Sequence, residues 1–136
     1  MSGTAFPSTT TQVDTTARFP LGYEVTLPAT KGGAGGVTNN AGSQTWIYVY
    51  NDNASVAFAA GHIIMRDASS ATYDGVPTTA GTLISTLRLL GVAQHAIAGG
   101  SYGFILRKGL GEVMAGDGAV IGANTALTSA GTTTAG

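Results

Sequence analysis

Ser101 is the residue of this chain whose surroundings most resemble a catalytic motif. It lies within Gly99-Gly100-Ser101-Tyr102-Gly103, which matches the G-x-S-x-G pattern of serine hydrolases. That chemistry needs a strand, a sharp turn and then a helix, so that the serine stands exposed at the end of a parallel sheet. Here Phe104-Ile105-Leu106-Arg107 follows and predicts a strand. At 136 residues the chain is also short for such a hydrolase. A small hydrolase using Ser101 and a histidine is therefore the weakest of the functions considered below.

The other groups capable of chemistry are scattered. His62 could pair with Asp67 or Asp74. His95 could pair with Glu112, but no HExxH or other close metal-ligand spacing is present. Cysteine is absent, which excludes disulfides and zinc–thiolate sites. The carboxylates are dispersed singly and do not suggest a glycosidase-type pair. We therefore expect no enzymatic activity, no metal and no cofactor.

The composition points toward assembly. Charged residues make up 10% of the chain, mean hydropathy is +0.22, and 21 residues are glycine. Ordinary soluble domains carry roughly 25% charged residues, and a free monomer needs surface charge to stay soluble. A chain with so little charge is expected to cover part of its surface with other chains, and we expect self-association as a homotrimer.

Nucleic acid and membrane are not expected partners. The net charge is -1, and Arg107-Lys108 is the only adjacent pair of cationic residues, which is too little to bind a phosphate backbone. The first residues lack the basic and apolar regions of a signal peptide. No run approaches the roughly 18 apolar residues of a membrane-spanning helix. We expect the protein to be made in the cytoplasm.

Short strands separated by glycine turns predict an all-β fold. Thr45–Tyr50 is the strongest strand, with Trp46, Tyr48 and Tyr50 on one face. This strand is either a core strand, the reading we favour, or an exposed aromatic recognition face. Tyr102–Lys108 predicts a second long strand. Further strands are expected at Phe19–Leu27 and His62–Arg66, and within Leu83–Ala98, where a helix is the alternative.

The turns complete this organisation. Ala-Gly turns recur between short apolar segments, and Tyr73–Pro77 is also expected to be a turn. The pattern predicts a small antiparallel barrel or sandwich. We expect this β-domain to span residues 19–127, followed by a flexible C-terminal tail over residues 128–136.

The Thr-rich segment of residues 1–18 is expected to form an extended N-terminal arm. It has too few apolar residues to offset the cost of ordering, about 1–2 kcal/mol per residue. It is either a simple tail or an arm that becomes ordered only against a partner. Phe6, Pro7 and Val13 are the anchors that favour an arm.

Three stretches resemble a known family. They are Arg18–Val25, Gly91–Phe104 (with its pattern GVA…IA-x-G-x-YG), and Gly116–Ile121 followed by Asn124-Thr125-Ala126-Leu127. They resemble segments of the capsid decoration, or cement, proteins of tailed bacteriophages. The motifs are glycine and alanine patterns that cover under half of the chain. The long Thr-rich N-terminus and the Gly-rich loop at 32–36 depart from the family pattern.

The resemblance implies a structural role. Decoration proteins are small β-rich proteins, often trimers, that bind the outside of an icosahedral head and stabilise it. By this resemblance the partner is the major capsid protein and the location is the capsid surface of the virion. A tail- or fibre-associated β-domain is the alternative. The candidate interface residues are Phe6, Pro7, Val13, Phe19, Trp46, Tyr48 and Tyr50.

Overall fold

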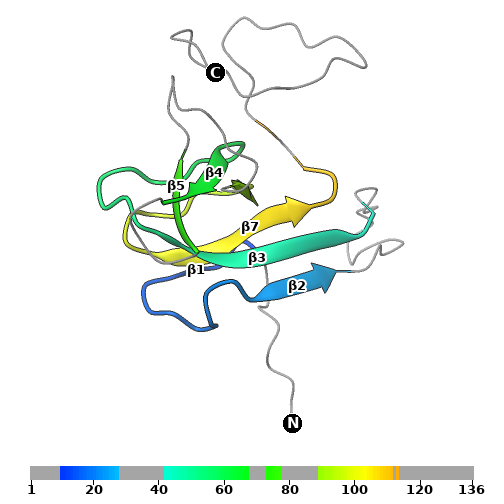
Figure 1. Cartoon of the computed structure of the whole chain (residues 1–136), viewed down its shortest axis with the longest axis horizontal. Coiled ribbons are helices and arrows are strands. Elements are labelled where there is room, and N and C mark those ends of the chain that lie inside the picture. Colours follow the sequence, from blue (N-terminus) through cyan, green and yellow to red (C-terminus); the bar gives the residue numbers. More distant parts are fainter. Residues whose placement is uncertain (1–9, 28–41, 68–72, 78–88, 112, 114–136) are drawn as a thin grey trace, which may run out of the picture.

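The protein is all-β. The computed structural model describes residues 10–27, 42–67, 73–77, 89–111 and 113, and within these ranges it contains strands and no helix. The strands are β1 (Val13–Asp14), β2 (Glu24–Leu27), β3 (Gln44–Asn51), β4 (Ile63–Arg66), β5 (Asp74–Pro77), β6 (Leu89–Val92) and β7 (Tyr102–Lys108) (Figure 1). The predicted fold class is thereby confirmed.

Five of the strands close into a barrel. The hydrogen-bonded order β7-β6-β4-β5-β3 is closed by a second pairing between β3 and β7. β3 and β5 run parallel, and the other pairs are antiparallel. The barrel is therefore mixed, whereas the sequence predicts an antiparallel one. β1 and β2 lie outside this ring, β1 against β7 and β2 against β3.

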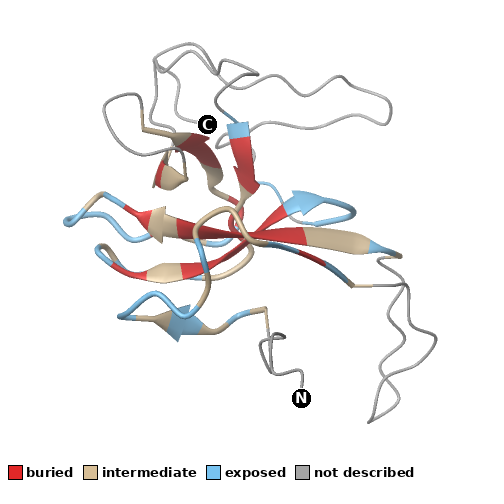
Figure 2. Ribbon diagram, turned by 60° about the horizontal axis from the view of Figure 1, so that its bottom comes forward, coloured by how far each residue is buried: buried red, intermediate tan, exposed pale blue. Residues whose placement is uncertain are grey.

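The two long strands β3 and β7 are shared by two separate cores. Their side chains alternate as predicted, so that Ile47 and Val49 face the barrel interior while Trp46 and Tyr48 face outward. On β7, Ile105 points inward and Phe104 outward. Both faces are apolar, and Figure 2 shows the buried residues concentrated along the middle of the long strands. The core-strand interpretation of Thr45–Tyr50 is therefore correct.

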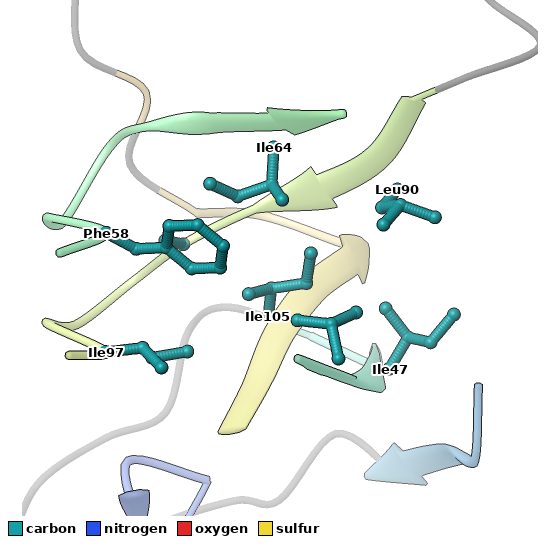
Figure 3. Packing of buried hydrophobic residues seen from close by; sticks show 8 residues of the cluster. Ile47, Phe58, Ile64, Leu90, Ile97 and Ile105 are labelled. Atoms are coloured by element: carbon teal, nitrogen blue, oxygen red, sulfur yellow. The ribbon is translucent and has the colours of Figure 1, made fainter. Parts of the chain in front are cut away.

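The barrel interior is filled mainly by aliphatic side chains. Ile47, Ile64, Ile97 and Ile105 are fully buried there, together with the ring of Phe58. Figure 3 shows how these side chains, which come from different strands and turns, converge on the barrel axis. Burial of each such side chain stabilises the fold by about 1.5–3 kcal/mol. This interior accounts for the closure of the five strands.

The buried Asn51 at the end of β3 ties two loops to the barrel. Its Nδ2 donates to the carbonyl oxygens of Val56 (2.9 Å) and Ile97 (3.0 Å), and its Oδ1 accepts from the amide of Asn53 (3.1 Å). A buried amide side chain is costly unless its donors and acceptors are satisfied. Here they are, so Asn51 fixes the turn after β3 and the approach to β7.

Two expected elements differ from the structure. The strand expected over Phe19–Leu27 covers only Glu24–Leu27, because the chain first makes a turn in which the Tyr23 amide donates to the Pro20 carbonyl (3.1 Å). The expected turn at Tyr73–Pro77 is instead β5 over Asp74–Pro77. Pairing with β3 on one side and β4 on the other overrides the local turn preference. Within the ambiguous segment Leu83–Ala98, the described part contains strand β6.

The N-terminal segment is part of the fold from residue 10 onward. Residues 10–18 lie against the barrel of their own chain, where Val13 and Asp14 pair with Gly103 and Tyr102 of β7. The expectation that the segment to Arg18 becomes ordered only on a partner is therefore wrong for residues 10–18. Residues 1–9 and the expected tail at 128–136 lie outside the described residues.

Candidate functional site

The predicted interface residues fall into different environments. Trp46 is 5% exposed and Tyr48 is fully buried, both within this one chain. The prediction that Trp46 is buried is confirmed, and these two side chains are core residues and not a free docking surface. Tyr50 is half-buried, and its ring lies 4.7 Å from that of Tyr102, centroid to centroid. Phe6 and Pro7 lie outside the described residues.

Aromatic rings cover the outer face of β3 and β7. Phe19 stacks on Tyr23, with ring centroids 5.3 Å apart and an interplanar angle of 8°. The same ring meets Tyr48 and Phe104 edge-on, at 5.3 and 5.5 Å. Val25 of β2 is buried in this cluster. We call the cluster of Phe19, Tyr23, Val25, Trp46, Tyr48, Tyr102, Phe104 and Leu106, with Leu21 and Leu27 at its margin, the aromatic layer.

Asp14 joins the aromatic layer to the N-terminal segment. The hydroxyl of Tyr48 donates to Asp14 Oδ2 (2.7 Å) and accepts from the backbone amide of Arg18 (3.3 Å). Asp14 Oδ1 also accepts from Gln12 Nε2 (3.0 Å) and lies 3.8 Å from Arg18 Nη1. A hydrogen bond to a carboxylate is stronger than one between neutral groups. Residues 10–18 are thus held by specific polar contacts.

Burial raises the pKa of the Tyr48 hydroxyl from its usual value near 10 to about 12. The amide of Arg18 lowers this pKa, and the carboxylate of Asp14, which accepts the hydroxyl proton, raises it. The hydroxyl is therefore neutral at physiological pH and acts as a donor to Asp14. No pattern in the sequence indicates this pairing, since the two residues are 34 positions apart and Asp14 is a lone acid in a Thr-rich segment.

Ser101 is placed as a structural residue. It is 6% exposed and directly precedes β7, so a strand and not a helix follows it. Its backbone carbonyl accepts from the Asn51 amide (2.9 Å). Among the described residues, no hydrogen bond joins Ser101 to His62 or His95. The strand–turn–helix setting of a nucleophilic serine is not met at this position.

Both histidine rings are engaged by backbone groups. His62 Nδ1 accepts from the Ala59 amide (3.2 Å), within a turn before β4. His95 Nε2 lies 3.0 Å from the Phe104 carbonyl oxygen, and its Nδ1 lies 3.1 Å from the carbonyl oxygen of Ala96. The Phe104 carbonyl faces away from β3, between the stretches of β7 that pair with β1 and β6. His95 therefore covers a gap in the sheet, which is a structural task.

A shallow open groove lies at the end of β7. Val92, Leu106 and Val113 supply apolar lining, and Arg107 and Lys108 stand at the same place. Leu110, in the turn beside it, is 66% exposed. The groove offers a volume of about 100 Å³, well below the roughly 300–1,000 Å³ of small-molecule sites. Its size suits one or two side chains better than a cofactor.

Other kinds of site find little support in the described ranges. No three His, Asp or Glu side chains gather there as a metal site would require. The described residues include no helix with the length and apolar character needed to cross a membrane. Comparisons with protein-family models, with curated proteins and with solved structures find no match. The function must therefore be inferred from residues and geometry.

Proposed function

We propose that this protein is a capsid decoration protein, which binds the outer surface of an icosahedral bacteriophage head and stabilises it. Its partner is the major capsid protein. The observation that carries the proposal is the structural role of the segment Gly91–Phe104, one of the three stretches that resemble that family. This segment forms the end of β6, the turn after it and the start of β7.

The glycines of this segment are required by close backbone packing. A Cβ on Gly91 would collide with the backbone carbonyl of Leu106 on the neighbouring strand. A Cβ on Gly99 would collide with the backbone carbonyl oxygen of Asn53 in the loop after β3. The motif is therefore a requirement of this barrel and not a chemical signature. A resemblance in residues that the backbone packing requires supports a shared fold. The proteins that would share it, the capsid decoration proteins, have a structural role.

The surface also supports an assembly role. Val13, Val56, Leu89, Leu110 and Val113 are large apolar side chains that are at least 40% exposed in the described part. A protein with 10% charged residues has little charge with which to solubilise them. A decoration protein gains from many copies, since each copy needs only a modest interface when it bridges several neighbours. Self-association as a homotrimer is part of this proposal.

Electron cryomicroscopy of particles purified from cells that produce this protein tests the proposal. We expect density for the β-barrel at regular icosahedral positions on the outside of the head. Density on the tail or its fibres would support the alternative of a tail-associated β-domain. Particles that lack the protein altogether would overturn both.

The hydrolase alternative has its own test. Labelling of the purified protein with a fluorophosphonate probe, with Ser101→Ala as the control, reports a nucleophilic serine directly. We expect no labelling that depends on Ser101. Labelling of the unmodified protein that Ser101→Ala abolishes would support the hydrolase instead.

A further inference from the structure

β2 presents an open edge of the sheet. Antiparallel strands alternate between residues whose backbone groups bond to the partner strand and residues whose groups point away from it. The Tyr48 amide donates to the Tyr23 carbonyl (2.9 Å), and the register then places Val25 opposite Trp46 at the next bonded position. It follows that the N–H and C=O groups of Glu24 and Thr26 point away from β3.

These outward groups have no backbone partner in the described part of the chain. β2 pairs with β3 alone there, and both Glu24 and Thr26 are exposed. An edge strand with free donors and acceptors is a template for another strand. An unpaired charge on an edge strand disfavours pairing with another strand. Here the charge of Glu24 is paired, because its Oε1 forms an ion pair with Arg107 Nε (3.2 Å).

The sequence of β2 complements itself when a second copy is placed antiparallel. If Val25 lies opposite Val25 of the second copy, each Glu24 lies opposite a Thr26, and their outward backbone groups meet as bonded pairs. On the other face Tyr23 lies opposite Leu27. Both of these side chains are half-buried at the margin of the aromatic layer, so pairing would bury more of their apolar surface.

Neighbouring registers are worse. Placing Glu24 opposite itself brings two carboxylates together, which destabilises a cross-strand pair. Placing Thr26 opposite itself brings Glu24 opposite Pro28, which has no N–H to donate. Each of these registers loses either a favourable pair or a hydrogen bond. The occupant that this edge fits is therefore a second copy of the same strand, in one register.

We infer that two copies of this protein associate through β2, in an antiparallel pairing centred on Val25. The sheet then continues from β3 of one copy through both β2 strands to β3 of the other. This inference goes beyond the proposed function, since it concerns copies of the chain and needs no capsid. A two-fold contact does not build a trimer, so it is distinct from the three-fold association proposed above.

A cysteine cross-link tests the pairing and its register. The natural chain has no cysteine, so a single substitution gives one unambiguous thiol. In this register the Val25 Cα atoms are about 4.5 Å apart, at a non-hydrogen-bonded pair, which a disulfide can bridge. The two Thr26 Cα atoms are about 9 Å apart, which a disulfide cannot bridge. Val25→Cys is the test and Thr26→Cys its matched control.

Under mild oxidation we expect Val25→Cys to form a covalent species of twice the 13.5 kDa chain mass. Thr26→Cys should form no such covalent species, although its copies still pair without a disulfide. Equal cross-linking of the two variants, or none in Val25→Cys, would overturn the inference. The test uses the free protein, so a negative result would not bear on whether the protein binds a phage head.

A second pair of variants tests the backbone contact itself. Thr26→Pro removes an N–H that bonds to no backbone group among the described residues of its own chain, while Thr26→Ala keeps that N–H. Sedimentation should show that Thr26→Pro weakens the dimer at least about tenfold, since two symmetry-related bonds are lost together, and that Thr26→Ala does not. A folded Thr26→Pro protein that dimerises like the unmodified one would contradict the pairing. Circular dichroism confirms that each variant is folded.

Discussion

The two faces of the β3–β7 pair are closed by different parts of the chain. The inner face is covered by the other barrel strands and their turns, and its side chains are mainly aliphatic. The outer face is covered by residues 10–27, and its side chains are mainly aromatic. The inner core needs the barrel to close. The outer core needs the N-terminal segment to lie on it. This segment is held by two hydrogen bonds of the Tyr48 hydroxyl, which donates to Asp14 and accepts from the Arg18 amide.

This difference shows that aromatic residues on a strong strand need not mark a docking surface. Trp46 and Tyr48 are hidden by a segment of their own chain. Surfaces that remain available in the described part are the edge of β2 and the exposed apolar residues near the end of β7. A partner is expected at these places and not at the aromatic face.

Trp46→Ala should produce the largest loss of stability from a single change in the aromatic layer, about 3–5 kcal/mol. The indole Nε1 is buried and has no hydrogen-bond partner among the described residues, so the expected loss comes from packing. Trp46→Phe should therefore retain most of the stability. Urea unfolding monitored by circular dichroism measures both. Stability like that of the unmodified protein in Trp46→Ala would mean that the outer face is not a core.

Ile105→Ala tests the inner core on the neighbouring strand. Ile105 is fully buried in the barrel interior, and truncation should lower the free energy of unfolding by about 2–5 kcal/mol. The exposed Val56, 43% exposed, provides the control, since Val56→Ala should change stability by less than about 0.5 kcal/mol. Equal effects of the two substitutions would contradict the placement of the barrel core.

Deletion of residues 2–17 separates the two parts of the N-terminal segment. It removes β1 and Asp14, and should destabilise the protein more than loss of the Tyr48 hydroxyl alone. Deletion of residues 2–9 leaves these contacts in place and should leave the stability unchanged. Thermal unfolding of both variants tests this, and a loss of stability that is the same for both would show that the boundary lies elsewhere.

Tyr48→Phe should have the smallest effect, about 1–3 kcal/mol, because it removes the hydroxyl that donates to the Asp14 carboxylate and accepts from the Arg18 amide. It should also change the response to alkaline pH. The folded-state pKa of about 12 lies above the unfolded value near 10, so the folded state keeps its proton more tightly. This stabilising contribution is complete below pH 10 and is lost as the pH rises through 12.

Unfolding measurements between pH 9 and 12.5 show whether that loss occurs. The unmodified protein should lose stability faster than Tyr48→Phe as the pH passes from about 10 to 12. Parallel curves for the two proteins would mean that the hydroxyl is not buried against Asp14.

Local patterns predicted much of the barrel. Alternation along Thr45–Tyr50 and Tyr102–Lys108 assigned each side chain to its face, and these assignments agree with the two cores. β-branched and aromatic residues dominate both runs, so propensity and burial point the same way. The parallel pairing of β3 with β5 was not predictable, because it depends on contacts between segments distant in sequence.

The candidate site was predicted less well than the fold, for a related reason. The threonines of the N-terminal segment suggested an arm without a core contact. The carboxylate of Asp14 instead holds this segment on the fold, because it accepts a hydrogen bond from the buried Tyr48. Asp14 contributes little hydrophobic stabilisation, so composition cannot identify it as an anchor. Its partner Tyr48 is 34 residues away. The open edge of β2 likewise depends on which backbone groups β3 leaves unpaired.

Native-state amide hydrogen exchange of the free protein tests most directly whether residues 10–27 belong to the fold. The Gly22 amide donates to the Tyr48 carbonyl oxygen (2.8 Å) beside the aromatic layer. The Phe58 amide donates to the Ile97 carbonyl oxygen (2.9 Å) at the barrel. We predict that the two amides exchange with similar free energies of opening, close to that of global unfolding. Exchange of Gly22 by a local opening of low free energy, with Phe58 fully protected, would contradict the account. The N-terminal segment would then be a loose cover, and the aromatic face would be available to a partner.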